Sequence, residues 1–212
     1  MSTSDQTMAE EPAAKRALIE QILQRRKALS REPLGVQMRP AAIPMSFGQE
    51  RLWHVEQISV SKGAYNISAG MRFKGRLDVD AMAAGLTTIV ARHEALRTRL
   101  VVQGAPGEAA EQVVDAPAPV ALQPMDVTED ALVGAMTAVA ARPLDLERGP
   151  LYHFTLFRLA EDDNVLAWVV HHIIADGWSV GVMMRELASL YNAFKAGQPS
   201  PLEPLRTRLS VM

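Results

Sequence analysis

Two histidines stand side by side at the end of an apolar run, and an aspartate and a glycine follow them in the stretch HHIIADGWS, residues 171–179. An imidazole titrates near neutral pH and can act as a general base, and an Asp-Gly pair favours a sharp turn. The preceding run VLAWVV is typical of a buried strand, along which successive side chains point to opposite faces. We therefore expect His171 and His172 to face opposite ways, so that only one of them enters any single site.

Because His171 and His172 are expected to face opposite sides of the strand, a metal site that uses both is not expected, since metal ligands must converge on one ion. Asp176 lies beyond a turn, and no third ligand stands at the usual spacing. The chain has no cysteine, which excludes a disulfide framework, a thiolate metal site and a cysteine nucleophile together. We expect no metal here. The alternative to a catalytic base is packing, with one satisfied core histidine beside another at the strand end.

The residues around this stretch alternate between strand-like and helix-like patterns. We expect strands where apolar residues alternate, and helices where they recur at helical spacing behind a capping residue. The expected strands are residues 65–75, 98–103, 110–116, 120–126, 151–160 and 164–174, with one hairpin joining the second to the third and another joining the last two. The expected helices are residues 81–96 behind Asp78 or Asp80, 129–142 between Thr128 and Pro143, and 179–197 between an N-cap Ser179 and Gly197. This order predicts a mixed α/β fold, with a mostly antiparallel or mixed sheet flanked by helices.

Segments outside this core differ in composition. Residues 1–11 are polar and are expected to form a disordered tail, whereas residues 12–29 carry apolar residues at helical spacing and predict an amphipathic helix that can serve for docking. Residues 30–44, with three prolines and a glycine, are expected to be a linker. The domain itself is expected to span residues 45–197, followed by a second linker-like segment at residues 198–212.

The composition excludes several classes of function. The 212 residues are 48% hydrophobic and 22% charged, which is enough apolar sequence for a globular core. The net charge is -2, with no basic stripe to neutralise phosphates, so nucleic acid is not an expected partner. The N-terminus carries acidic residues where a signal peptide needs an apolar core, and no apolar run approaches the ~20 residues of a membrane span. We therefore expect a cytoplasmic protein without a membrane segment.

Three stretches of the chain resemble motifs of one known family. HHIIADG, residues 171–177, matches the HHxxxDG signature of the condensation domains of nonribosomal peptide synthetases, which is shared with chloramphenicol acetyltransferase and its relatives. MSFGQERLWHVEQ, residues 45–57, is similar to the opening S-x-A-Q-x-R-L-W motif of condensation domains. RHEALRTRL, residues 92–100, resembles their R-H-E-x-L-R-T-x-F motif, with leucine where phenylalanine is usual. The resemblance implies a chloramphenicol acetyltransferase-like lobe.

The resemblance also implies a reaction, the formation of an amide bond. An acyl or peptidyl thioester on one carrier protein is attacked by the amine of an aminoacyl thioester on another, both on phosphopantetheine arms, and this chain itself binds no cofactor. His172 is implied to accept the proton of the amine or to position the amine, while His171 supports the strand. Gly177 is implied to let the arm or a backbone N–H approach the reacting carbonyl. Trp178 and Ser179 are the expected substrate contacts.

Asp176 completes the implied catalytic signature, and we expect its role to be more structural than chemical. Arg51, beside an apolar Leu-Trp pair, needs a partner if it is buried, and so does Asp176. The resemblance implies that these two residues pair and shape the loop. For the other motif residues we expect packing, with Leu52, Trp53, Leu96 and Leu100 in the core and with Arg92, His93 and Glu94 as a polar helix end containing a local salt bridge.

Two other functions are compatible with the sequence. The resemblance covers residues 44–204, which correspond to the first of the two lobes of a condensation domain. The chain is therefore expected to need a second lobe, or to self-associate, before it forms amide bonds. One alternative is a non-catalytic lobe for docking or assembly. Another is an oligomeric acetyl-CoA-dependent acetyltransferase of the chloramphenicol acetyltransferase type, against which Arg51 and the RHEALRT stretch argue.

Overall fold

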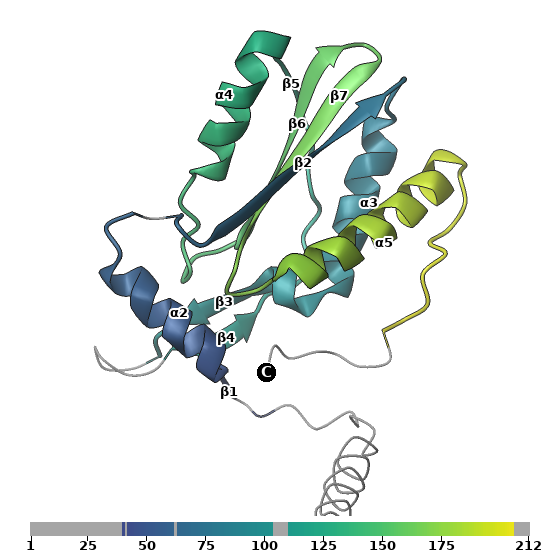
Figure 1. Cartoon of the computed structure of the whole chain (residues 1–212). Helices are drawn as coiled ribbons and strands as arrows, with labels where there is room; N and C mark the ends of the chain where they lie inside the picture. The colour runs from purple at the N-terminus through teal and green to yellow at the C-terminus, as the bar shows by residue number, and fades with distance from the viewer. Residues whose placement is uncertain (1–39, 41, 62, 104–109, 206–212) are drawn as a thin grey trace, which may run out of the picture. The chain divides into compact units, whose positions relative to one another are not determined.

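The structure, a computed structural model of the chain, describes residue 40 and residues 42–61, 63–103 and 110–205 (Figure 1). The expected tail, the expected N-terminal helix and most of the first linker lie outside these residues. The described part contains, in chain order, β1 (Ile43–Pro44), α2 (Phe47–Ile58), β2 (Asn66–Lys74), α3 (Val79–Arg92), the 3-10 helix η1 (Glu94–Arg97), β3 (Thr98–Val101), β4 (Glu111–Val114), β5 (Pro124–Asp126), α4 (Glu129–Ala140), β6 (Tyr152–Ala160), β7 (Asp163–His171) and α5 (Gly177–Lys195). None of the helices in these described segments is long and apolar enough to span a membrane.

Two sheets organise the described residues. The larger has the strand order β2-β7-β6-β5, in which β7 pairs antiparallel with both neighbours and β5 pairs parallel with β6. The smaller has the order β1-β4-β3, with antiparallel pairs throughout. The pairing of β3 with β4 and of β6 with β7 confirms both expected hairpins. The mixed, mostly antiparallel sheet flanked by helices confirms the expected fold class.

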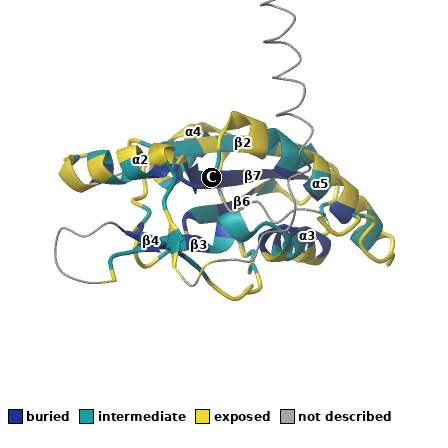
Figure 2. Ribbon diagram, turned by 90° about the horizontal axis from the view of Figure 1, so that it is seen from below, coloured by how far each residue is buried: buried dark blue, intermediate teal, exposed yellow. Residues whose placement is uncertain are grey.

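The central strand β7 separates two apolar layers. Every residue of β7 is buried, and Figure 2 shows the strand between β2 and β6. Leu166, Trp168 and Val170 belong to the main core, which also contains the apolar faces of α3 and α5. Val165 and Ala167 belong to a smaller cluster with Leu132 of α4. Strand alternation therefore places α3 and α5 on one face of the sheet and α4 on the other, as Figure 1 shows.

Helix α3 begins where one of the two expected caps stands. The carboxylate of Asp78 accepts a hydrogen bond from the N–H of Ala81 at 2.9 Å, so Asp78 is the N-cap and Asp80 lies in the first turn. The helix crosses α5 at Gly85, where an added Cβ would lie 3.1 Å from Cδ1 of Leu187. Any side chain at this position would require the Leu187 side chain to shift by a few tenths of an ångström. The α-helix ends at Arg92, and η1 continues the chain, so the helix is shorter than expected.

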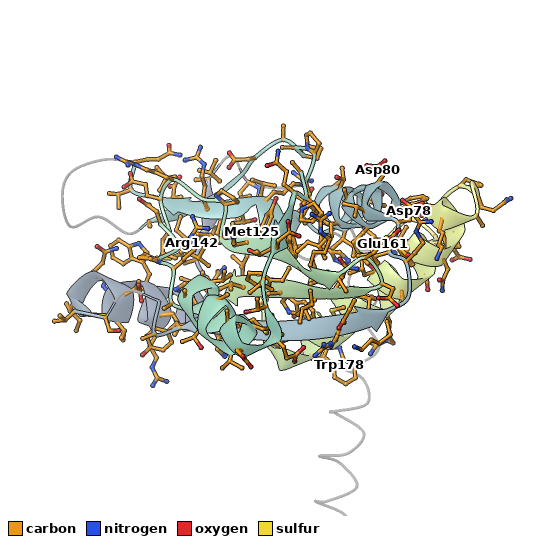
Figure 3. The ribbon with its side chains drawn as sticks, turned by 90° about the horizontal axis from the view of Figure 1, so that it is seen from above. Asp78, Asp80, Met125, Arg142, Glu161 and Trp178 are labelled. Atoms are coloured by element: carbon orange, nitrogen blue, oxygen red, sulfur yellow. The ribbon has the colours of Figure 1, made fainter. Side chains whose placement is uncertain are left out.

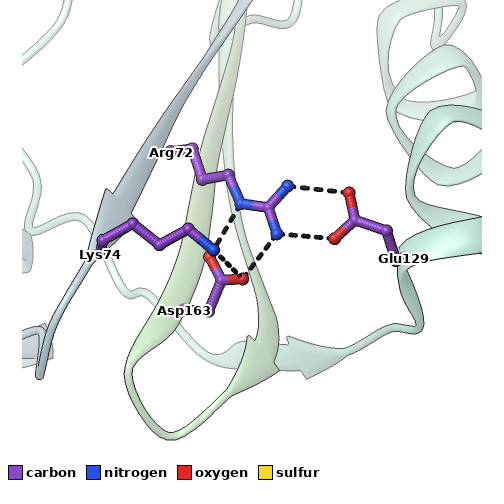
Figure 4. Close-up of polar contacts among 4 residues, drawn as sticks. All are labelled: Arg72, Lys74, Glu129 and Asp163. Atoms are coloured by element: carbon purple, nitrogen blue, oxygen red, sulfur yellow. Dashed lines mark hydrogen bonds and ion pairs between the residues drawn. The ribbon is translucent and has the colours of Figure 1, made fainter.

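An ionic cluster attaches the start of α4 to the sheet (Figure 4). The guanidinium of Arg72 donates two hydrogen bonds to Asp163 at 2.8 and 2.5 Å and two to Glu129 at 2.8 and 2.6 Å. Lys74 adds a bond to Asp163 at 2.7 Å. The hydrogen bonds from Arg72, and then those from Lys74, hold the pKa of Asp163 well below its usual range. The cluster joins β2, β7 and α4.

Candidate active site

The adjacent histidines face opposite sides of the sheet. His171 is 0% exposed, whereas His172 is exposed and lines a cavity. The backbone N–H of His171 donates to the carbonyl of Leu151 at 2.9 Å, and that of His172 donates to the carbonyl of Tyr65 at 2.8 Å. The two N–H groups therefore bond to strands on opposite sides of β7. This is the orientation expected from strand alternation.

The imidazole of His171 organises the turn that follows the strand. Its Nδ1 accepts a hydrogen bond from the N–H of Ile173 at 3.1 Å, so the proton of the neutral ring is on Nε2. Burial and, to a smaller extent, the neighbouring charge of His172 lower the pKa of His171 to about 4. At neutral pH the ring is therefore uncharged. His171 holds the turn, and His172 is the histidine that faces the cavity.

Asp176 caps the helix that begins after this turn. Its Oδ1 accepts hydrogen bonds from the backbone N–H of Ser179 at 2.8 Å and from the hydroxyl of Ser179 at 2.7 Å. These two bonds lower the pKa of the Asp176 carboxyl group. The expectation that Ser179 is the N-cap is wrong, because α5 starts at Gly177 and its N-cap is Asp176, three residues before Ser179. Ser179 is instead the residue to which the cap binds.

The expected ion pair between Arg51 and Asp176 is also wrong. Both residues are exposed, and the described residues contain no salt bridge between them. The pair was expected because a buried Arg51 and a buried Asp176 would each need a partner, but neither side chain is buried. Asp176 is occupied by capping α5, and Arg51 lies on the exposed side of α2. In the described residues, Arg51 therefore does not shape the histidine loop through Asp176.

Gln49, which sequence reasoning missed, links the first motif to the histidine turn. Its side chain is 3% exposed and donates to the carbonyl of Ile173 and to Oε1 of Gln112, each at 3.3 Å. Its own Oε1 accepts from the N–H of Ser46 at 2.9 Å, within a capping box at the start of α2. The signal in the sequence was a Ser-x-x-Gln pattern before a helix, which predicts such a box. The link to Ile173 depends on tertiary packing.

A cavity of about 650 Å³ joins these elements. Most of its lining comes from the start of α2, the end of α3 with η1, the turn at residues 172–176 and the first half of α5, and Val170 and Leu205 also line it. The cavity therefore brings all three sequence motifs together. A volume of this size is typical of a small-molecule site.

The second motif forms part of the cavity wall. Glu186 of α5 accepts a hydrogen bond from Nε of Arg92 at 3.1 Å and another from Nε2 of His93 at 2.6 Å. All three side chains line the cavity. A local salt bridge was expected among Arg92, His93 and Glu94, but Arg92 and His93 pair with Glu186 instead, and the local ion pair of Glu94 is with Arg97, at 3.3 Å. Sequence reasoning assigned Arg92 and His93 to a helix end and missed Glu186, whose place on the cavity side of α5 depends on helix packing.

Of the remaining expected site residues, Trp178 and Ser179 line the cavity, whereas Gly177 is not among its lining residues. Trp178 is 79% exposed and projects at the outer edge of the molecule (Figure 3). An added Cβ at Gly177 would meet nothing within 4 Å, so the described residues impose no steric need for glycine there. Leu96 and Leu100 are buried as expected, and Leu52 and Trp53 pack partly buried against the same core.

Comparisons with known sequences identify relatives over most of the chain. The family model for the condensation domain matches residues 40–207. The chain is 41% identical over 167 residues to chondramide synthase from Chondromyces crocatus, which covers 76% of this chain and 4% of that protein. It is 34% identical over 203 residues to phosphinothricin tripeptide synthetase PhsC from Streptomyces viridochromogenes, which covers 90% of this chain and 18% of that protein.

Solved structures show the same fold. The X-domain from teicoplanin biosynthesis superposes with a TM-score of 0.77 at 33% identity, covering 83% of this chain and 38% of that chain. The first condensation domain of the calcium-dependent antibiotic synthetase superposes with a TM-score of 0.69 at 25% identity, covering 77% of this chain and 40% of that chain. The chain thus spans less than half the length of the solved domains and a small part of the synthetases. From the match over residues 40–207 and these relatives, we conclude that the chain belongs to the condensation domain family.

Proposed function

We propose that this chain supplies the histidine-bearing wall of a site that joins a carrier-bound acyl or peptidyl thioester to a carrier-bound aminoacyl thioester. The observation that carries the proposal is the position of His172, whose side chain lines a cavity built from all three motif segments. The family match supports the same reaction class. The substrates are the thioesters themselves, each delivered on the phosphopantetheine arm of a carrier protein.

The proposed step needs little acid-base chemistry. The amine nitrogen attacks the thioester carbonyl carbon, the carbon–sulfur bond breaks, and the proton lost by the amine passes through the His172 imidazole to the departing thiolate. An α-amine has a pKa of about 8, so an appreciable fraction is already neutral at pH 7. His172 therefore acts as a general base, as a group that positions the amine, or as both.

Several residues around His172 have supporting roles in this proposal. His171 holds the turn through Ile173, and Asp176 starts α5 beside the histidine. Trp178 and Ser179 lie at the cavity mouth, where they can contact the arms. Gly177 leaves open space for a backbone N–H to approach a carbonyl. We propose that a second lobe, or a second copy of the chain, forms the opposite wall.

An assay with two loaded carrier proteins tests this proposal. The donor and acceptor carriers are mixed with the chain, and the condensed product is detected by mass, while light scattering gives the oligomeric state. We expect no product from a monomer, because half a site cannot hold both arms and proximity is the main source of rate. Product from a proven monomer would contradict the need for a second wall. Product from an oligomer would show that subunits supply that wall.

A chimera tests the role of His172. Residues 40–207 of this chain replace the matching part of an active condensation domain, and His172→Ala is compared with His54→Ala, which removes an exposed histidine of α2. We expect His172→Ala to lower the rate ~10²–10⁴-fold if the imidazole is a general base. A loss below about tenfold indicates positioning instead. An unchanged rate would refute any role of His172 in the reaction.

A second candidate function is recruitment of a protein partner. The neighbour that favours it is the X-domain from teicoplanin biosynthesis, which was also solved in a complex with OxyB and is 34% identical in that structure. In this reading the cavity is not used for chemistry. The chimera then gives no product even with intact His172, although the swapped domain folds. The intact HHxxxDG signature of this chain favours the condensation site as the first candidate.

A further inference from the structure

Asn66 and His171 lie directly opposite each other on the neighbouring strands β2 and β7. The N–H of His172 bonds to Tyr65 on the β2 side, whereas the N–H of His171 bonds to Leu151 on the other side. The Asn66–His171 pair is therefore a non-hydrogen-bonded pair of the antiparallel ladder. In such pairs the Cα atoms are about 4.5 Å apart and the side chains lie closest to each other.

Each of these two side chains carries one buried polar atom that has no hydrogen-bond partner among the described residues. Since Nδ1 of His171 accepts from Ile173, its Nε2 is a donor, and this donor is unpaired. Nδ2 of Asn66 donates to the carbonyls of Ala140 and Arg142 at 3.0 and 2.8 Å. These two bonds fix which end of the amide is the oxygen, and they leave Oδ1 as an unpaired acceptor. A donor and an acceptor thus remain on facing residues.

We propose that one buried water links Nε2 of His171 to Oδ1 of Asn66, and that Asn66 is a positioning residue for the histidine pair. Buried polar groups are almost always paired, and ordered water pairs those that protein atoms cannot reach. The water completes a path of hydrogen bonds from the end of α4 through Asn66 and His171 to the N–H of Ile173. That path ends at the turn that places His172 in the cavity.

The path gives His171 a defined tautomer. Burial keeps the pKa of His171 far below neutral, at about 4, so the ring carries a single proton, which the donation from Ile173 to Nδ1 assigns to Nε2 and which can then bond to the water. The link also connects the two faces of the sheet, because α4 lies on one face and the cavity on the other. This inference concerns the geometry of the histidine pair and stands independently of the proposed amide-forming activity.

Nuclear magnetic resonance on the 212-residue chain with ¹⁵N-labelled histidine tests the proposal. The chain has five histidines, and His171→Gln identifies the signals of His171 by their loss. At neutral pH we expect His171 to show an Nε2–H tautomer, slow exchange of that proton with solvent, and magnetisation transfer to a bound water. A ring protonated on Nδ1, or an Nε2–H without a neighbouring water, would overturn the proposal.

Variants at Asn66 separate positioning from stability. Asn66→Asp keeps an acceptor and Asn66→Leu removes it, and both lose the donation to the end of α4. We expect both to lower the Tm by roughly 3–9 °C, while only Asn66→Leu loses the slowly exchanging Nε2–H of His171. Ser68→Ala, at an exposed position of the same strand, is the matched control. If both Asn66 variants changed the Nε2–H signal of His171 equally, the positioning role of Asn66 would be overturned. If Asn66→Leu does not fold, the spectrum of the wild-type chain still decides which nitrogen of His171 carries the proton.

Discussion

The carboxylate of Glu186 lies 2.6 Å from Nε2 of His93, which donates a hydrogen bond to it. The same carboxylate pairs with Arg92, and the three side chains are only 14%, 25% and 16% exposed, in the order Glu186, His93 and Arg92. Arg92 and His93 stand at the end of α3, and Glu186 stands in α5. This largely buried ionic cluster therefore joins two helices that form walls of the cavity.

Replacement of Glu186 is expected to destabilise the fold. Glu186→Ala leaves Arg92 without its carboxylate in a mostly buried site, which should lower the free energy of unfolding by roughly 2–4 kcal/mol. Urea denaturation measures the change. The control is Glu161→Ala, because Glu161 pairs with Arg76 at 3.0 Å while both side chains are 78% and 85% exposed. That pair should contribute less than about 0.5 kcal/mol. If the two variants lost the same free energy of unfolding, burial of the Glu186 cluster would add nothing to its contribution to stability.

Asp176 and Arg51 are expected to act independently. Asp176→Ala removes the cap of α5 and should cost about 1 kcal/mol, whereas Arg51→Ala should change stability by less than about 0.5 kcal/mol. A double-mutant cycle measures their interaction energy, which we expect to be near zero. Asp176→Asn should keep most of the cap. An interaction energy above about 1 kcal/mol would restore the ion pair that the described structure lacks.

The stability of the fold should fall as the pH falls from about 6.5 to about 4 because of His171. The folded state keeps this ring neutral, whereas in the unfolded state it takes up a proton below its ordinary pKa of 6.5. The unfolded state thus binds more protons in this window, so stability rises with pH across it. The difference between pKa values of 6.5 and about 4 corresponds to roughly 3–3.5 kcal/mol. Urea denaturation midpoints at pH 7.5 and about pH 4.5 measure how much the stability changes with pH. We expect His171→Gln to reduce this change, whereas the control His54→Gln should leave it unaltered.

Gln49 is expected to contribute more to the stability of the fold than an uncharged side chain usually does. Gln49→Ala removes bonds to Ile173, Gln112 and Ser46 from a buried position, and should cost roughly 1–3 kcal/mol. Gln57→Ala, at an exposed position of the same helix, is the control and should be near neutral. Thermal unfolding compares the two. If Gln57→Ala were as damaging as Gln49→Ala, the loss could not be assigned to the buried hydrogen bonds of Gln49, because alanine itself favours the helix more than glutamine does.

The periodicity of the sequence determined the elements and their faces. The alternation in VLAWVV was sufficient to separate His171 from His172, because side chains of a strand alternate whatever packs around it. The sequence also predicted that Asp78 or Asp80 caps α3, and the structure shows that Asp78 is the cap. At α5 the sequence predicted the wrong cap, Ser179, whereas the structure uses Asp176, a residue type equally suited to an N-cap.

The long-range partners of the polar side chains were decided by tertiary structure. Gln49 and Ile173 are 124 residues apart in sequence, and His93 and Glu186 are 93 apart, so no local pattern links them. The sequence suggested Arg51 as the partner of Asp176 on the assumption that both were buried, but the packing of α2 leaves Arg51 exposed. Periodicity specifies which face of a strand or helix is apolar. The way those faces pack against one another sets the distances between their polar atoms, and therefore which residues line the cavity around His172.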